Sequence, residues 1–301
     1  YNIISAVFRG MGDSKSPMYF IAVACAANIA LDYLFIGVLG MGPAGAALGT
    51  TLSQAVSVVI SLIVVKRRKT DFSLEKTDLK PDKQIIGKIL KIGVPVAMQD
   101  GFIQIAFIVI TIIANRRGLN EAAAVGIVEK IISFLFLVPS SMLSTVSALG
   151  AQNIGAGKYD RTDDILRYAI AIGVGFGAVM ALLMQFIAPS MVRPFTSDEA
   201  VVKAGAAYIR SYIFDCLFAG IQFSFSGYFC AWGRSGLSFL HNTLSILLVR
   251  VPGAWLACRF FPQTLVPMGL APACGSLFSS IVCVLLYRWM KSQNKPTGNK
   301  D

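Results

Sequence analysis

Charged side chains interrupt the apolar segments of this chain at six places, and these residues could carry chemistry. Four are acids and two are bases: Asp32, Asp100, Glu129, Lys130, Asp215 and Arg250. An ionised group in the middle of a bilayer costs about 2.5–3.5 kcal/mol on insertion scales, so each one is a candidate for function. The excess of acids favours a cavity that binds cations.

Asp215, Glu129 and Asp100 are the candidates for binding a coupling cation. Asp215 has no basic residue three or four positions away, so its partner must be on another helix, a bound ion or a proton. Glu129 and Lys130 point about 100° apart on a helix, so each needs its own partner. Asp100 follows Pro95 by about one turn, where a freed backbone group could help to bind an ion. A purely structural or interfacial role is the alternative for each acid.

Other polar residues could line a cavity for an organic ligand. The candidates are Gln99, Gln104, Gln152, Asn153, Gln222 and Tyr228. Aromatic faces attract organic cations, although most of the rings in so apolar a chain are expected to face lipid or core. His241 is expected to be a satisfied interfacial histidine, with a proton relay as the alternative. Arg250 is expected to pair with a carboxylate, with substrate contact as the alternative.

The elements that must position these residues are membrane-spanning helices. Hydrophobic residues make up 55% of the chain, charged residues 14%, and the mean hydropathy is +0.66. A spanning helix needs about 20 mostly apolar residues. The runs of that length lie near 17–39, 43–65, 94–114, 122–150, 168–192, 204–232, 236–258 and 264–290. We therefore predict an all-α polytopic membrane protein with eight transmembrane helices, and not an enzyme, since no nucleophile or metal motif is present.

The net charge of +11 is a topology signal rather than a nucleic-acid signal. Nineteen of the 27 Lys and Arg residues fall in alternate loops, and six in the intervening ones. This asymmetry predicts a plasma-membrane protein whose 66–91 loop and C-terminus are cytoplasmic. The six cysteines show no paired spacing, so we expect neither disulfides nor a metal site, and no cofactor.

A repeat indicates two related helix bundles. Ser5, Phe8, Gly12 and Ser14 match Ser226, Phe229, Gly233 and Ser235, each pair 221 residues apart. Repeats of this kind are typical of secondary transporters. The second copy follows a long apolar region that the first copy lacks, so we expect about 130 residues to be missing before Tyr1.

Asn28 and Asp32 are four residues apart and lie on one helix face, so they predict a polar cluster.

The repeat and the polar segment together predict the domain boundaries. Residues 1–65 would be the remnant of an N-terminal lobe, namely the end of its fourth helix with its fifth and sixth. Residues 66–91 would be a cytoplasmic linker, including a short surface helix over 85–91. A six-helix C-terminal lobe would cover 92–290, and a cytoplasmic tail 291–301.

Several short motifs together resemble the bacterial multidrug and toxic compound extrusion (MATE) family. They are Arg9–Asp13 with Pro17, Asn28 with Asp32, Gly42–Ala47, Pro95, Gln152–Ala156 and Arg250–Pro252. The resemblance implies twelve helices in two pseudo-symmetric lobes, of which this chain holds the fifth to the twelfth. It also implies export of amphipathic, usually cationic compounds in exchange for Na⁺ or H⁺ by alternating access. It favours a structural role for Asn28 and Asp32, and a monomer in the lipid bilayer.

The resemblance leaves gaps and alternatives. Some sodium-coupled members carry a glutamate where this chain has Ile103 and Gln104, so the coupling ion stays open. A flippase for a lipid-linked oligosaccharide is the nearest alternative. It would need several cations inside its cavity, whereas only Lys130 and Arg250 lie deep in apolar runs. An integral membrane enzyme is the other alternative.

Overall fold

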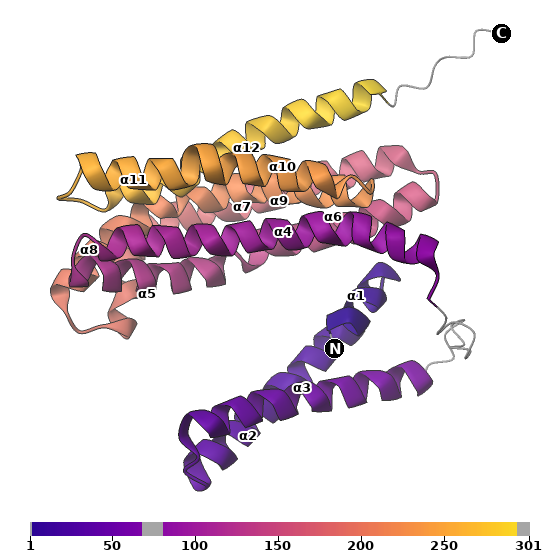
Figure 1. Cartoon of the computed structure of the whole chain (residues 1–301), viewed down its shortest axis with the longest axis horizontal. Coiled ribbons are helices and arrows are strands. Elements are labelled where there is room, and N and C mark those ends of the chain that lie inside the picture. Colours follow the sequence, from indigo (N-terminus) through magenta and orange to yellow (C-terminus); the bar gives the residue numbers. More distant parts are fainter. Residues whose placement is uncertain (1, 68–80, 294–301) are drawn as a thin grey trace. The chain divides into compact units, whose positions relative to one another are not determined.

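The computed structural model describes residues 2–67 and 81–293, which form two compact units, residues 1–83 and 84–301 (Figure 1). The described residues form helices joined by turns and contain no strand. Eight helical segments among them are long and apolar enough to cross a membrane. The all-α polytopic fold and its eight spans, both predicted from the apolar runs, are confirmed.

Unit 1 is a helix pair preceded by a short helix. Its elements are α1 (Asn2–Gly10), α2 (Lys15–Asp32), the π-helical continuation η1 (Tyr33–Val38) and α3 (Gly42–Arg67). Helices α2 and α3 pack side by side, and the Ser57 hydroxyl on α3 donates to the Phe20 carbonyl on α2 at 3.1 Å. Asp32 lies against Gly49, where a Cβ would overlap with its carboxylate.

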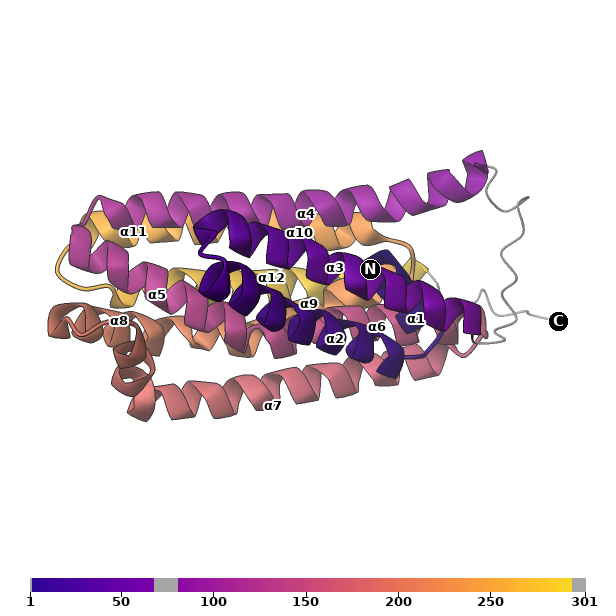
Figure 2. The same ribbon diagram turned by 90° about the horizontal axis from the view of Figure 1, so that it is seen from below.

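Unit 2 contains the other six spans, which Figure 2 shows from a second direction. Its elements are α4 (Lys83–Asn115), α5 (Leu119–Leu135), α6 (Leu137–Gly155), α7 (Tyr159–Val192), η3 (Arg193–Phe195), α8 (Glu199–Tyr212), α9 (Phe214–Ala231), α10 (Ser235–Ser245), η4 (Ile246–Arg250), α11 (Val251–Phe260) and α12 (Val266–Gln293). Three spans are interrupted along their length, where α5 joins α6, where α8 joins α9, and where α10 joins η4 and α11, and a fourth span continues at its end from α7 into the short η3.

Prolines explain two of these three breaks. A proline lacks an N–H and its ring clashes with the carbonyl four residues earlier. Pro139 lies four residues after the end of α5 at Leu135, and Pro252 follows the π-helical segment η4. The third break, at Ile213, has no proline beside it. Pro95, by contrast, lies inside the unbroken helix α4.

Helix α9 lies at the centre of unit 2 and makes unusually close crossings through glycines. A Cβ on Gly220 would lie 2.6 Å from the carbonyl carbon of Gly173 on α7, and one on Gly227 would lie 2.5 Å from the Leu143 carbonyl oxygen on α6. Small residues allow helix backbones to approach closely in membranes, where helices associate through packing. These contacts fix the helix that carries Asp215.

The repeat read from the sequence has the same turn in both copies. Gly12 and Gly233 both have positive φ, +89° and +67°. The residue after each glycine donates its backbone N–H to the phenylalanine five positions earlier, Phe8 at 2.9 Å and Phe229 at 2.8 Å. This is the hydrogen bond of a glycine C-cap, and it ends α1 and α9 in the same way.

The first turns of α4 lie within the stretch predicted as the linker between lobes. The two compact units divide between Lys83 and Gln84, and residues 83–91 are the start of α4 instead of a separate surface helix. Pro95 has no N–H to donate to the Lys91 carbonyl one turn earlier, but the helix continues through it. That carbonyl accepts a hydrogen bond from Ser235 Oγ at 3.3 Å instead. Within the predicted linker, residues 68–80 lie outside the described residues, and within the predicted tail, residues 294–301 do.

Candidate functional site

Asp215 lies directly after the break between α8 and α9, in the first turn of α9 rather than in the middle of a helix. Its side chain has no exposed surface. Backbone N–H groups at a helix N-terminus favour a negative charge, so the break provides a buried position that suits a carboxylate. Residues on both sides of the break belong to the same core cluster.

Arg250 is the partner of Asp215. Arg250 is the last residue of the π-helical segment η4, and its guanidinium donates to Asp215 Oδ2 at 2.5 Å. The Arg250 side chain is 12% exposed. Gly275 on α12 makes room for it, because a Cβ there would overlap with the arginine stem. Of the three partners open to Asp215 from sequence, the structure therefore shows a base on another helix.

The pair is not fully satisfied within the described residues. Asp215 Oδ1 and Arg250 Nε are buried and have no hydrogen-bond partner there. A small cavity of about 10 Å³ borders Arg250 and Tyr212. A space of that size holds at most about one water molecule. The pair thus has spare hydrogen-bonding capacity beside a cavity for one small species.

Two tyrosines and a second carboxylate complete the cluster. Tyr208 and Tyr212 on α8 are buried, with 1% and 2% of their surface exposed, and their rings lie 5.5 Å apart. Tyr212 lines the same small cavity as Arg250, and α8 packs against α5, the helix that carries Glu129. The cluster therefore comprises the Asp215–Arg250 pair and the two tyrosines, with Glu129 as the second carboxylate on the neighbouring helix α5.

Glu129 differs from Asp215 because the described part of the chain shows no cation paired with it. Its carboxylate is half-buried, and Thr111 Oγ1 lies 3.4 Å from both of its oxygens. The neighbouring Lys130 is exposed. With both acids ionised, Glu129, Asp215 and Arg250 together carry one net negative charge, which a single cation would neutralise.

Other residues proposed from sequence lie elsewhere. Asp100, Gln104 and Gln152 are exposed on the surface of unit 2, and Asn153 donates to the Leu149 carbonyl of its own helix at 2.8 Å. The described residues contain no group of His, Cys, Asp and Glu side chains that could hold a metal ion.

Three of the predicted cavity residues are buried between helices. Gln99 accepts a hydrogen bond from Ser238 Oγ at 2.7 Å, and Gln222 donates to Ser276 Oγ at 3.0 Å. Tyr228 donates to Asp163 Oδ1 at 2.9 Å and is 1% exposed. These side chains connect helices within unit 2, and their role in lining a cavity for an organic ligand stays a prediction.

Histidine and the polar pair of unit 1 also have defined surroundings. His241 is fully buried between Ser226 and Ser279, at 3.0 Å and 2.7 Å, so it lies in the bundle interior instead of at the interface. In unit 1, Asn28 Nδ2 and Asp32 Oδ1 are buried without hydrogen-bond partners among the described residues.

Sequence reasoning missed Tyr208, Tyr212 and Thr111. A usable signal existed, because Tyr208, Tyr212 and Asp215 follow one another at intervals of four and three residues, which places them on one helix face. Thr111 carried no comparable signal, since its only distinguishing feature is its contact with Glu129 across the bundle.

Comparisons with known proteins agree on one family. The model of the MatE family matches residues 95–256. YpnP of Bacillus subtilis, described as a probable multidrug resistance protein, is 31% identical over 290 residues, covering 96% of this chain and 64% of its own length. YoeA of the same organism, also described as a probable multidrug resistance protein, is 29% identical over 66% of this chain and 44% of its own length.

The fold is shared with solved structures. A multidrug resistance MATE family transporter of the MOP superfamily, solved in its outward-facing conformation, superimposes with a TM-score of 0.90 at 22% identity. The match covers 97% of this chain and 66% of that one. The chain thus spans less than two thirds of the length of the relatives it matches.

Proposed function

The chain belongs to the MatE family, and from this premise we propose that it acts in a secondary transporter that exports amphipathic organic cations in exchange for Na⁺ or H⁺. The observation that carries the proposal is the half-buried Glu129 carboxylate, which has no paired cation among the described residues. It lies on α5, which packs against α8 in the span that also carries the buried Asp215.

The cluster suits exchange because it can be neutralised by one cation at a time. The buried pair is neutral as a unit, so Glu129 supplies the net negative charge. An organic cation, Na⁺ or a proton can each neutralise Glu129, and occupation by one opposes binding of another. Competition of this kind, together with alternating access between two lobes, couples inward movement of the ion to outward movement of the drug.

The Asp215–Arg250 pair has a second role in this mechanism. Breaking a buried ion pair leaves an uncompensated charge, so the pair resists opening unless another charge replaces a partner. A proton or Na⁺ on Asp215 would release Arg250, and the adjacent break at Ile213 and the π-helical segment η4 would allow the two spans to bend. We propose this release as the conformational step of transport.

The alternatives receive less support. A carrier of anionic pyrophosphate needs free cations at depth, whereas Arg250 is paired with Asp215 and Lys130 is exposed on the surface of unit 2. A membrane enzyme does not fit membership of a transporter family. Following the distribution of basic residues, we further propose that the C-terminus is cytoplasmic and that one copy is the working unit.

Drug efflux from cells tests the proposal. Ethidium efflux is measured for wild type, Glu129→Gln, Asp215→Asn and the control Glu199→Gln, at several Na⁺ concentrations and pH values. Glu199 is an exposed carboxylate whose side chain pairs with Arg193 at 3.1 Å, outside the cluster. We expect Glu129→Gln to lower the efflux rate about tenfold or more at unchanged membrane abundance, and Glu199→Gln to leave it unchanged.

The other outcomes separate the parts of the proposal. Normal efflux in Glu129→Gln would remove Glu129 from coupling. Lost efflux only in Asp215→Asn would move the coupling site to the buried pair. No efflux by wild type under any ion gradient would overturn the drug-export proposal itself.

A further inference from the structure

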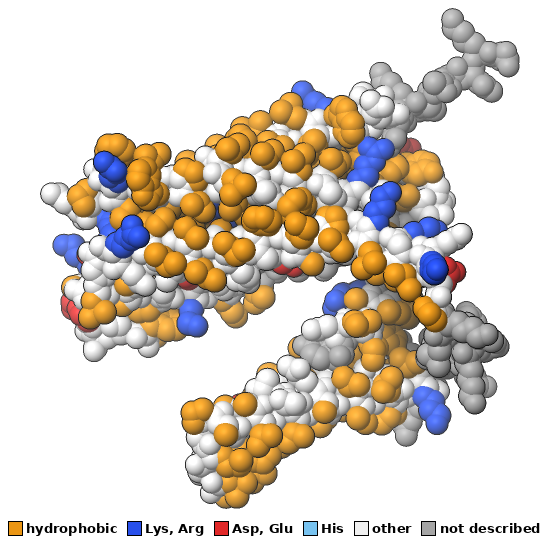
Figure 3. Space-filling model, viewed as in Figure 1, with side chains coloured by type: hydrophobic (Ala, Val, Ile, Leu, Met, Phe, Trp, Pro, Cys, Tyr) orange, Lys and Arg blue, Asp and Glu red, His pale blue; other side chains and the backbone are white. Residues whose placement is uncertain are grey.

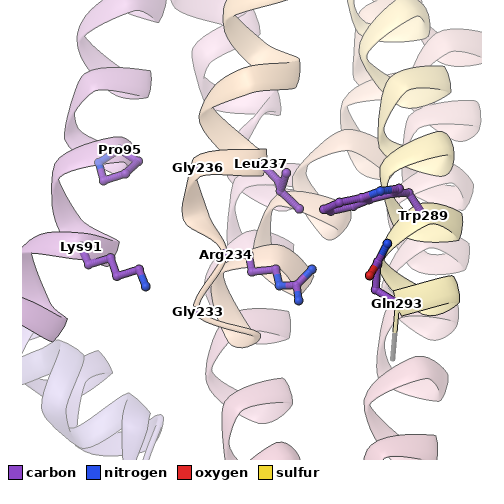
Figure 4. A pocket seen from close by; sticks show the side chains of 8 residues that line it. All are labelled: Lys91, Pro95, Gly233, Arg234, Gly236, Leu237, Trp289 and Gln293. Atoms are coloured by element: carbon purple, nitrogen blue, oxygen red, sulfur yellow. The ribbon is translucent and has the colours of Figure 1, made fainter. Parts of the chain in front are cut away.

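A groove opens at one end of unit 2, between the first part of α4, the start of α10 and the last turns of α12 (Figure 4). Its volume is about 580 Å³. The lining residues are Lys91, Pro95, Gly233, Arg234, Gly236, Leu237, Trp289 and Gln293. No acidic side chain is among them, and the groove lies apart from the cluster around Asp215.

The groove presents two positive charges. Lys91 and Arg234 both line the groove: in Figure 4 the Lys91 side chain extends from α4 toward α10, and the Arg234 side chain extends from the start of α10 toward Trp289 on α12. The Arg234 guanidinium lies 5.8 Å from the centre of the Trp289 ring, a cation–π contact that holds the guanidinium in place. The ion pairs found within the described residues involve neither Lys91 nor Arg234.

The repeat shows what is different at this place. In unit 1, the Asp13 carboxylate accepts hydrogen bonds from the backbone N–H groups of Lys15 and Ser16, at 3.0 Å and 3.1 Å, and so stabilises the start of α2. The position 221 residues later is Arg234, whose side chain makes no hydrogen bond to the start of α10. Where unit 1 has an anion of its own, unit 2 has a cation beside a groove.

The groove lies at the level of lipid headgroups. Lys91 is separated from the far end of α4, at Asn115, by about 36 Å at a rise of 1.5 Å per residue. A bilayer's hydrocarbon core is about 30 Å thick, so Lys91 falls just beyond it. Trp289 is the kind of residue enriched at this level. In Figure 3 the face of unit 2 is hydrophobic along its middle, with Lys and Arg gathered at its ends.

We propose that this groove binds the headgroup phosphate of an anionic phospholipid, with Lys91 and Arg234 pairing with the phosphate and the acyl chains following the apolar walls at Pro95 and Leu237. The proposal goes beyond drug export and does not depend on it. The Ser235 hydrogen bond to the Lys91 carbonyl ties α4 to the start of α10, so the two backbone segments that carry the basic residues are held together at the groove.

Native mass spectrometry of the purified protein with defined lipids tests this site. Binding of phosphatidylglycerol and phosphatidylcholine is compared for wild type, Lys91→Gln, Arg234→Gln and the double variant. We expect phosphatidylglycerol to bind about fivefold more weakly for each basic residue removed. Phosphatidylcholine binding is expected to change much less, because its choline group cancels the charge of its phosphate, and its retention also shows that the variants are folded.

Arg259→Gln is the matched control. Arg259 also lies over a tryptophan, 5.5 Å from the centre of the Trp255 ring, but it is not part of the groove. Its replacement is expected to leave phosphatidylglycerol binding unchanged. An equal loss in Arg259→Gln and Arg234→Gln would show a general charge effect and overturn the proposal.

A competition arm distinguishes a lipid from a free anion. Inorganic phosphate at millimolar concentration is added to the wild-type protein with bound phosphatidylglycerol. Retention of the lipid supports the proposal. Displacement of the lipid by inorganic phosphate, or equal lipid binding by wild type and the double variant, would overturn it.

Discussion

Replacing Arg250 with methionine isolates the energetic role of the buried pair. The substitution keeps a long side chain beside Gly275 but leaves the Asp215 carboxylate without its partner, at a position with no exposed side-chain surface. Removing one member of a buried ion pair destabilises a protein by about 3–5 kcal/mol, since the remaining charge is neither solvated nor paired.

A double-variant cycle separates the pair from the packing. Asp215→Asn removes the charge that Arg250→Met leaves behind, so the double variant is expected to be more stable than Arg250→Met alone by about 2 kcal/mol. A loss of packing alone would give the opposite order, because a second substitution would then add a second loss.

Cysteine labelling reports the opening of this region. Cys216 is next to Asp215 and fully buried, whereas Cys283 is fully buried on α12 in the other core cluster and provides an internal reference. A local loss of 3 kcal/mol raises the labelling rate of Cys216 by a maleimide about a hundredfold, since each 1.4 kcal/mol is a factor of ten. An unchanged Cys216 rate in Arg250→Met, or a double variant that labels faster than it, would refute the reasoning.

Two further predictions concern packing and capping. Gly173→Ala places a Cβ 2.8 Å from the Gly220 backbone and is expected to destabilise the protein by about 1–3 kcal/mol. Gly175→Ala on the same helix meets nothing within 4 Å and is expected to be neutral or slightly stabilising. Thermal unfolding compares the two variants, and equal effects would contradict the close crossing. Asp13→Ala removes the hydrogen-bond acceptor at the start of α2 and is expected to lower the stability of that helix end by about 1 kcal/mol. Hydrogen exchange of the first α2 amides is then expected to be about fivefold faster. An unchanged exchange rate would show that the carboxylate does not stabilise these amides.

The number of spans could be predicted from sequence because the bilayer imposes it. A continuous apolar run of about 20 residues has few alternatives to a spanning helix, since its backbone groups must be satisfied internally. The ends of those helices were less predictable. Residues 83–91 belong to α4 because the helix continues through Pro95. The Lys91 carbonyl, which Pro95 leaves without a helical partner, accepts a hydrogen bond from Ser235 on a helix far away in the sequence.

The breaks within spans show where local rules are insufficient. Pro139 and Pro252 mark two of them, and a reader of the sequence can locate both. The break at Ile213 has no such mark, so the predicted run 204–232 continues through it, whereas Asp215 lies at the start of α9. Tertiary packing decides that break, because the residues on both sides belong to the buried core.

The pairing of Asp215 could not be chosen from sequence for a related reason. Its partner lies 35 positions away on another span, and three kinds of partner satisfied the sequence equally. The choice matters for mechanism, because a carboxylate that already has a cation is a different group from one that lacks it. The sequence names Asp215, Glu129 and Asp100 as candidates for coupling, and our proposal selects Glu129 because the described residues show no cation paired with it. On this reasoning, an exchangeable charge inside a membrane protein is sought at the acid that lacks a counter-ion, because burial alone does not distinguish the candidates.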